Sequence, residues 1–599
     1  MCGFISSFSI ATVRSDLVEA ARLGLSTMNR RGPDAEGFWT DAACVLGHRR
    51  LAIQDLDLRS NQPMHSACGR YVIVFNGEIY NFDTLRHELA ATGILFRTTS
   101  DTEVLLALFA HEGEEMLARL RGMFAFVIWD RSTRRAFAAR DPYGIKPLYW
   151  TQTVDGLMMA SQVRALLATG QVSRAPCARG QANFWLLGSV AEPYTWYRDI
   201  KALPAGHCAW VEDGRMGTPR RWWDVAAAWR EAPAAVPSLA DVRECVHAAL
   251  RASVRAHLVA DVPVGVFLSG GIDSGALAGL MVGAGAQKLQ GITLTYDEFS
   301  GTHDDEAPVA VKLARHYGIY HHVRRVTRAE FETDLPRILA AMDQPSVDGI
   351  NTWYASKAVA ELGLKVVVSG VGGDELFQGY PSFKQLPRLV AAWAPASCLP
   401  GAMPLAHAVM GCQARRSGNA RWHYSPDWAR TMAGAWWLRR GLYSPAELPS
   451  LMGPELAAEG LQGFNPDAWI GQMCGTLSPD SRLAVGQIES TSYMLNQLLR
   501  DSDWASMDHS VELRTPLVDA WLLRDLQPLL RTLRKFPNKR LLAESPTVPL
   551  PAVVVGRIKT GFSIPTQIWL KQMGKTSDRV GPSNAWAREV ARVYDGGEL

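Results

Sequence analysis

The chain has 599 residues, of which 47% are apolar, and 62 basic residues against 59 acidic ones give a net charge of +3. This length and composition predict a soluble globular protein of roughly two to four domains. No long run of one charge sign occurs, which argues against nucleic-acid or membrane partners and favours small-molecule substrates. Nine scattered cysteines without Cys-x-x-Cys pairs argue against a disulfide framework or a zinc site and fit a cytoplasmic location.

A cysteine stands at position 2, directly after the first methionine. We expect Met1 to be removed because the next residue is small, which would leave Cys2 with an α-amine beside its thiol. An α-amine titrates at about 7.7–8.0, so a fraction of it is unprotonated at neutral pH and can act as the base for the thiol. By itself, a cysteine at this position is more often incidental.

Four polar motifs follow, separated by alternating apolar segments that are typical of antiparallel strands. Together they supply a guanidinium for a carboxylate, acids for an ammonium group and an Asn-Gly corner for an oxyanion. An α-amino acid amide needs this combination of groups. The motifs are Arg30–Asp34, Gly47–Ile53, Phe75–Asn81 and Ser100–Glu103.

With Cys2, these motifs resemble the glutaminase domain of class II, N-terminal-nucleophile amidotransferases. The resemblance implies an α+β sandwich of antiparallel sheets over about residues 1–215. It also implies that Cys2 attacks the side-chain amide of glutamine and that Asn76 and Gly77 form the oxyanion hole.

The same resemblance assigns the remaining glutamine contacts. Arg50 would bind the α-carboxylate of glutamine, with Arg49 as the competing candidate. Glu78 and Asp101 would bind its ammonium group, and Asn76 and Gly77 would also contact glutamine.

The segments Ala139–Tyr149 and Ala160–Leu166 resemble the asparagine-synthetase branch of these amidotransferases. Gln162 stands where the family usually has Glu, and Arg164 where it has Lys, in a stretch that we expect near the domain junction. An alanine- and proline-rich linker is expected within residues 216–238.

A glycine-rich turn, Ser269–Ser274, lies between an apolar strand predicted over Val262–Leu268 and a helix predicted over Gly275–Val282. Its glycines let backbone N–H groups approach a polyanion, its serines add donors, and Asp273 can hold a divalent metal on the same phosphates. The turn matches neither the Gly-Lys-Ser/Thr phosphate loop nor the dinucleotide fingerprint. It resembles pyrophosphate-binding loops of enzymes that activate an acid as its AMP ester.

Strand and helix patterns alternate beyond the linker and predict an α/β doubly wound parallel sheet, with ligands at the carboxyl ends of the strands. A second glycine-rich stretch, Ser369–Tyr380, follows the apolar strand Lys365–Val368. The two stretches should therefore converge on one nucleotide. Asp273 and Asp374 would supply the acids of a Mg²⁺–pyrophosphate site.

These loops resemble those of the glutamine-hydrolysing asparagine synthetases. The resemblance implies an ATP-dependent synthetase domain over 239–599 with a helical insertion at 381–479. It assigns catalytic roles to Lys559, which would place positive charge on the phosphates, and to Glu375. It implies ATP binding by Phe267, Leu268, Ser269, Gly270, Gly271, Asp273, Ser274, Leu294, Ser369 and Gly370.

The implied reaction has four steps: glutamine hydrolysis, passage of ammonia through an internal channel, activation of a carboxylate by Mg²⁺–ATP, and amide formation. A homodimer is compatible with the sequence. Aspartate is the expected acceptor. Val371, however, replaces a Glu that many members carry beside the aspartyl adenylate. Amidation of another carboxylate, such as a uronic sugar, a peptide or a secondary-metabolite acid, is the alternative. A catalytically silent binding or regulatory homologue is the third hypothesis, and the intact Cys2, Asp273, Asp374 and Lys559 oppose it.

Overall fold

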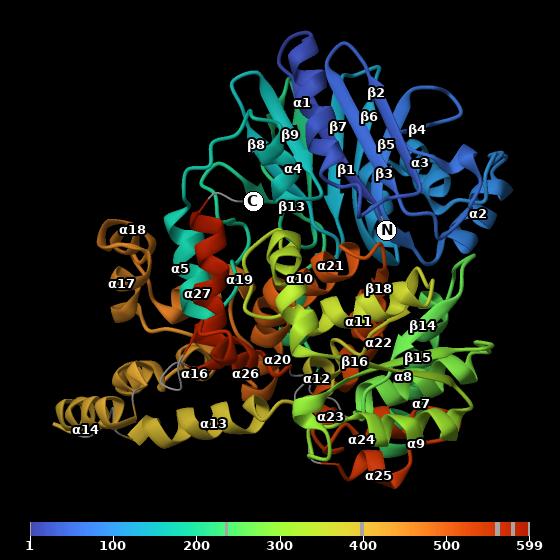
Figure 1. Ribbon diagram of the computed structural model, residues 1–599. Helices are drawn as coiled ribbons and strands as arrows, with labels where there is room; N and C mark the ends of the chain where they lie inside the picture. Colours follow the sequence, from blue (N-terminus) through green and yellow to red (C-terminus); the bar gives the residue numbers. More distant parts are fainter. Residues whose placement is uncertain are drawn as a thin grey trace.

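The computed structural model describes residues 2–233, 238–395, 401–417, 419–557, 564–576 and 581–596. A sandwich of two antiparallel sheets forms the N-terminal third of the chain. The remaining two thirds surround one parallel sheet (Figure 1), and the blue-to-cyan sandwich lies directly above this green-to-red part. The predicted fold class is therefore confirmed.

The first sheet of the sandwich has the order β10-β8-β9-β1-β3-β2, and the second has the order β12-β11-β7-β6-β5-β4 with β13 paired to β11. Alternate residues of β1 and β5, such as Phe4, Phe8, Val72 and Val74, fill the space between the sheets. The strands are β1 Gly3–Ser9, β2 Ala35–Thr40, β3 Cys44–Arg50, β4 Met64–His65, β5 Tyr71–Ile79, β6 Gly122–Asp130, β7 Arg135–Arg140, β8 Tyr149–Gln152, β9 Gly156–Ala160, β10 Lys201–Ala202, β11 His207–Glu212, β12 Arg215–Met216 and β13 Arg220–Arg221.

Helices cover the outer faces of the sandwich. The α3 helix starts after Ser100, whose side chain caps it by accepting a hydrogen bond from the N–H of Glu103. The stretch predicted as a linker contains a short helix, α6, with Trp229 buried. The helices are α1 Ser15–Ser26, α2 Phe82–Ala91, α3 Asp101–Glu112, α4 Val163–Ala168, α5 Ala178–Leu187 and α6 Val225–Arg230.

The parallel sheet has the strand order β16-β15-β14-β17-β18. Because β14 and β17 are neighbours, the glycine-rich stretches that follow them emerge at the same edge of the sheet. The elements are α7 Leu239–His257, β14 Val264–Phe267, α8 Ile272–Gly283, β15 Gln290–Tyr296, α9 Ala307–Tyr317, β16 Tyr320–Val326, α10 Arg328–Ala341, α11 Ile350–Glu361, β17 Val366–Val368 and β18 Glu512–Arg514. The α8 helix begins three residues earlier than predicted, so the first glycine-rich turn runs directly into its N-terminus.

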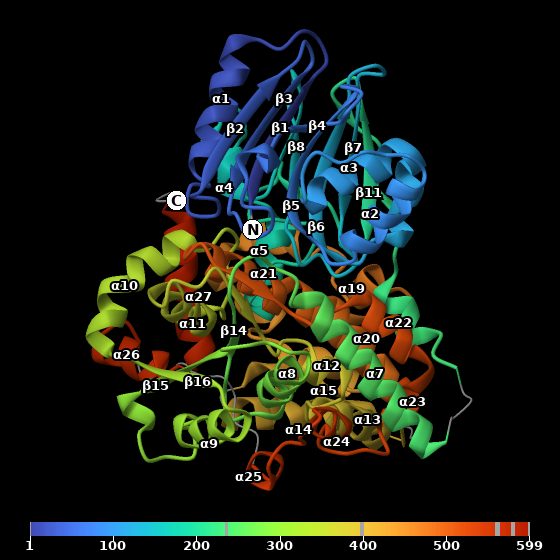
Figure 2. The same cartoon turned by 90° about the vertical axis from the view of Figure 1, so that its right-hand side faces the viewer.

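The rest of the chain is helical, and a π-helix, Glu489–Leu499, precedes α21. The end of α27 returns to the N-terminal part, where the rings of Tyr594 and Trp196 are 5.5 Å apart (Figures 1 and 2). In the described residues no helix is long and apolar enough to cross a membrane. The remaining helices are α12 Gly373–Leu376, α13 Ser382–Trp393, α14 Ala402–Ser417, α15 Ser425–Trp428, α16 Met432–Arg440, α17 Leu448–Met452, α18 Pro454–Gly460, α19 Pro466–Cys474, α20 Ser481–Ile488, α21 Arg500–Met507, α22 Ala520–Leu526, α23 Leu530–Leu533, α24 Arg540–Glu544, α25 Ala552–Val555, α26 Thr566–Gln572 and α27 Pro582–Asp595.

Candidate active site

Cys2 lies just before β1 and is buried, with 8% of its surface exposed. Its backbone nitrogen donates to Oδ1 of Asn76 over 3.2 Å. The Nδ2 group of Asn76 is buried and has no hydrogen-bond partner among the described residues. Because an unpaired buried donor is costly, this amide is poised to donate to a ligand beside Cys2.

Gly77 allows β5 and β6 to approach one another beside Asn76. A Cβ at this position would lie 2.1 Å from the carbonyl oxygen of Met123, and its φ of +157° is rarely adopted by other residues. Any larger residue would therefore push the two strands apart and displace Asn76 from Cys2.

The two arginines at the end of β3 point in opposite directions, as neighbouring strand residues do. Arg49 forms an ion pair with Glu36 on β2. Arg50 donates from Nη1 to the carbonyl of Asp57 over 2.9 Å and to Oδ1 of Asn61 over 2.8 Å. Burial raises the pKa of the Cys2 thiol, and the charge of Arg50 opposes this shift.

The two predicted ammonium-binding acids are buried near Cys2. Asp101 accepts a hydrogen bond from the N–H of Ile79 over 2.9 Å, and burial raises its pKa to about 6. Burial and the nearby carboxylates of Glu512 and Asp101 raise the pKa of Glu78 well above its ordinary value. Arg514 lies 3.8 Å from Glu78 and opposes that shift, so β18 of the parallel sheet completes this pocket.

A second buried ionic contact, next to the backbone of Cys2, joins the two halves of the molecule. The Nε group of Arg31 donates to the carbonyl of Cys2 over 3.1 Å, and its Nη1 group lies 2.6 Å from Asp503 on α21. Lys146 lies 3.5 Å from the same carboxylate. Burial disfavours the charged carboxylate, but Arg31 and Lys146 hold the pKa of Asp503 below its usual value.

The segment with the Gln162 and Arg164 replacements lies at the junction between the halves, as expected. The first backbone N–H groups of α4, from Val163 and Arg164, donate to the carboxylate of Asp343 over 2.8 and 3.0 Å. Gln162 itself is buried, with 2% of its surface exposed. Asp343 therefore anchors α4 to the parallel-sheet half.

A cavity of about 790 Å³, here called the first cavity, opens at the carboxyl ends of β14 and β17. Every predicted ATP-binding residue except two lines it: Phe267, Ser269, Gly270, Gly271, Asp273, Ser274, Ser369 and Gly370. Leu268 and Leu294 do not line its wall, because both are buried in the core. The N–H of Leu268 is also engaged with the carbonyl of Ile292 over 2.8 Å.

A lysine that the sequence motifs did not reveal lies between the two predicted metal ligands. The Nζ atom of Lys539 is 2.5 Å from Oδ2 of Asp273 and 2.5 Å from Oδ1 of Asp374. Lys539 lies far from Asp273 in the sequence, near the other end of the synthetase part of the chain. No glycine-rich motif accompanies it. The pair of acids is therefore brought together as predicted, around a shared cation.

Glu375 and Arg557 also line the first cavity, and each lies next to another charged side chain. Burial, followed by the neighbouring Asp374, raises the pKa of Glu375 to about 7, and the hydroxyl of Tyr380 donates to its Oε1 over 2.9 Å. Arg557 lines the cavity and pairs with Glu306 over 3.3 Å. Lys559, the predicted phosphate-binding cation, lies outside the described residues.

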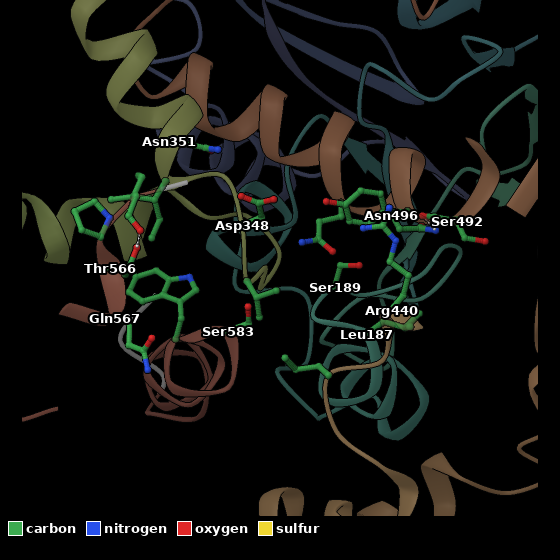
Figure 3. Close-up of a pocket in the computed structure, with 18 of the residues that line it drawn as sticks. Leu187, Ser189, Asp348, Asn351, Arg440, Ser492, Asn496, Thr566, Gln567 and Ser583 are labelled. Carbon is green, nitrogen blue, oxygen red and sulfur yellow. Dashed lines mark hydrogen bonds between the residues drawn. The ribbon is translucent and has the colours of Figure 1, made fainter. Parts of the chain in front are cut away.

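A second cavity, of about 550 Å³, adjoins the first, and both are lined by Asp348, Asn351 and Tyr493. Figure 3 shows Asp348 between two groups of lining residues, with Ser189 and Asn496 on one side and Thr566 and Gln567 on the other. No sequence motif pointed to this cavity. Its walls come from α5, α16, the π-helix, α26 and α27, which are far apart along the chain.

Comparison with known proteins explains the combination of sites. A glutamine amidotransferase domain model matches residues 1–223, and an asparagine synthase model matches residues 246–584. The chain is 33% identical to a putative glutamine-hydrolyzing asparagine synthetase of Mycobacterium tuberculosis, covering 98% of this chain and 89% of the relative. It is 30% identical to glutamine-hydrolyzing asparagine synthetase 1 of Bacillus subtilis, over 98% and 90% of the two chains. Asparagine synthetase B of Escherichia coli is 30% identical over 65% of this chain and 66% of its own length. The chain therefore belongs to the glutamine-hydrolysing asparagine synthetase family, a family of ATP-dependent ligases.

Proposed function

We propose that this protein hydrolyses glutamine at Cys2 and uses the ammonia to amidate a carboxylate that ATP activates in the first cavity. The observation that carries the proposal is the Nδ2 group of buried Asn76, which has no hydrogen-bond partner among the described residues and lies beside a cysteine that removal of Met1 would leave at the N-terminus. The family supports glutamine-dependent amidation as the reaction class.

In the glutaminase site, the free α-amine of Cys2 would accept the thiol proton as the thiolate attacks the glutamine amide carbon. The Nδ2 group of Asn76 and the backbone of Gly77 would donate to the developing oxyanion. Arg50 would hold the α-carboxylate of glutamine, and Glu78 with Asp101 would hold its ammonium group. Ammonia would leave as the thioester forms, and water would then release glutamate.

In the first cavity, the two glycine-rich turns and Lys539 would hold the phosphates of ATP. Asp273 and Asp374 offer carboxylate oxygens, the donor type that Mg²⁺ prefers, on a site that already attracts a cation. A Mg²⁺ ion held there would neutralise charge on the pyrophosphate. Lys559 would add positive charge from the segment that follows Arg557.

The substrate carboxylate would attack the α-phosphorus of ATP and release pyrophosphate. Ammonia would then form the C–N bond as the bond to AMP breaks, and a proton would leave with the products. The buried contacts between the halves, at Arg31 and Asp343, support an enclosed passage between the sites. Enclosure matters because ammonia is protonated in bulk water and an acyl-adenylate is hydrolysed there.

Aspartate is the acceptor to which the names of the relatives point. A larger carboxylate is the second candidate, and two observations favour it. Val371 lines the first cavity where the family resemblance leads us to expect an acid, and the second cavity extends the site well beyond the size of aspartate.

The proposal is tested by following glutamate and pyrophosphate release with Mg²⁺–ATP, glutamine and a panel of carboxylic acids. Cys2→Ala should abolish glutamate release and leave amide formation from added ammonium salts. Cys245→Ala is the matched control, because Cys245 is an exposed cysteine on α7 that lines neither cavity. A Cys2→Ala protein that still hydrolyses glutamine would refute the assignment.

A further inference from the structure

Arg514, at the end of β18, belongs to the synthetase half of the chain, but its side chain reaches the pocket of Cys2. The side chain is fully buried, and its Nη2 atom lies 3.8 Å from Oε2 of Glu78 on β5. This Nη2 group has no hydrogen-bond partner among the described residues, although buried donors are normally paired. An approach closer by about 1 Å would bring it to the distance of a charge-assisted hydrogen bond to Glu78, roughly 2.7–2.9 Å.

The other two nitrogens of the Arg514 guanidinium are fixed by the synthetase half. Nη1 donates to the carbonyl of His257 over 2.8 Å and to the carbonyl of Val259 over 2.7 Å, at the end of α7. Nε donates to Oε1 of Glu512 over 2.6 Å. The distance between the guanidinium and Glu78 therefore depends on where β18 lies.

The backbone of Arg514 contacts the other site. Its carbonyl accepts a hydrogen bond from the N–H of Ser369 over 2.8 Å, directly after the parallel pairing of Val368 with Arg514. Ser369 begins the second glycine-rich stretch and lines the first cavity. Arg514 thus contacts a wall residue of the first cavity through its main chain and a predicted glutamine ligand through its side chain.

Glu78 is linked in turn to the reacting centre of the glutaminase site. Asn76 and Glu78 are two residues apart on β5, so their side chains lie on the same face of the strand, and Asn76 accepts a hydrogen bond from the backbone nitrogen of Cys2. Burial raises the pKa of Glu78, and the charge of Arg514 opposes this shift. An ammonium group binds the charged carboxylate, so the position of Arg514 affects both the placement and the charge of Glu78.

We propose that Arg514 is a positioning residue shared by the two sites, through which a nucleotide in the first cavity strengthens glutamine binding beside Cys2. A nucleotide in contact with Ser369 and Gly370 would fix the start of the second glycine-rich stretch, and with it the strand position of Arg514. The guanidinium would then stay within reach of Glu78 and favour the charged carboxylate. This inference rests on the proposed function and adds a coupling between its two sites.

The test measures the KM for glutamine in glutamate release by the unmodified protein, without an acceptor, in the presence and absence of Mg²⁺ and α,β-methylene-ATP. This analogue cannot release pyrophosphate. Coupling between two sites typically changes an affinity by about 5- to 150-fold, and we expect the analogue to lower the KM at least about fivefold. The same KM in both conditions would overturn the inference and leave the amidotransferase function standing. No glutamate release in either condition would refute the proposed function and the inference with it.

Arg514→Lys locates the coupling, because lysine keeps the charge but lacks the planar fork that contacts α7 and Glu78 at once. We expect the analogue to lose its effect on the KM for glutamine in this variant. Arg121→Lys is the matched control, because Arg121 joins the same two halves through Asp519 over 2.9 Å and lines neither cavity. The control should keep the effect of the analogue. Equal loss in both variants, or no loss in Arg514→Lys, would contradict the proposal.

A binding measurement makes the test independent of the folding of Arg514→Lys. Coupling is reciprocal, so glutamine should lower the Kd of the analogue by the same factor by which the analogue lowers the Kd of glutamine. Isothermal titration calorimetry measures both values with Cys2→Ala, which lacks the nucleophile. Affinities that do not depend on the other ligand would overturn the inference.

Discussion

Replacing Asp503 with asparagine removes the carboxylate that joins α21 to the N-terminal sandwich. The side chains of Arg31 and Lys146 are 2% and 1% exposed, so both cations would remain buried without the carboxylate that now neutralises them. Breaking a buried ion pair by removing one partner costs about 3–5 kcal/mol. Asparagine can still accept a hydrogen bond, so we expect a loss near the lower end, about 3 kcal/mol.

A loss of this size corresponds to a fall in Tm of about 6–12 °C, at about 2–4 °C per kcal/mol for a large domain. Glutaminase activity should fall as well, because Arg31 also donates to the carbonyl of Cys2. Differential scanning calorimetry and glutamate release measure the two effects. The folded-state pKa of Asp503 is depressed, so its contribution is complete above its ordinary value of 3.8 and is lost as the pH falls further.

The exposed pair of Arg14 and Asp16 provides the control. Their side chains are 60% and 55% exposed, and ion pairs this exposed contribute little to stability, so Asp16→Asn should leave Tm nearly unchanged. If Asp503→Asn melts at the same temperature as Asp16→Asn and hydrolyses glutamine normally, the ionic contact neither stabilises the junction nor positions Cys2.

Lys539→Met removes the cation shared by Asp273 and Asp374. We therefore expect pyrophosphate release to fall at least about 100-fold while glutamate release persists. Undiminished pyrophosphate release would exclude Lys539 from the phosphate site. Glu375 has a folded-state pKa of about 7 against an ordinary 4.5, so its stabilising contribution is complete below pH 4.5 and is lost as the pH rises to 7. Glu375→Gln should therefore show a smaller decline of Tm between pH 4.5 and 7 than the unmodified protein, and parallel profiles would contradict the assignment.

The sequence was sufficient for the parts of the molecule that depend on local patterns. The two glycine-rich turns follow apolar strands, and neighbouring parallel strands bring Asp273 and Asp374 to one edge of the sheet, as predicted. Lys539 could not be found in this way, because it lies in a turn directly before α24, in a stretch without a motif. Asp503 and Arg514 were missed for a related reason, since they act on Cys2 only after two halves of the chain pack together.

The second cavity illustrates the same limit more strongly. Trp436 and Trp586 are ordinary core residues by composition, and only the packed structure shows that both line this cavity. Leu268 and Leu294 do not line the first cavity, and their side chains are buried in the core. Apolar side chains next to a phosphate-binding turn are buried beneath it, where the core provides more favourable contacts than the cavity wall.

The position of Asp503, Glu512 and Arg514 late in the chain has a consequence for synthesis on the ribosome. The sandwich emerges first and can begin to fold while the remainder is still being made. The residues that complete the surroundings of Cys2 are translated only after some 500 others. We therefore expect a nascent chain to lack a complete Cys2 pocket until the synthetase half has almost been completed.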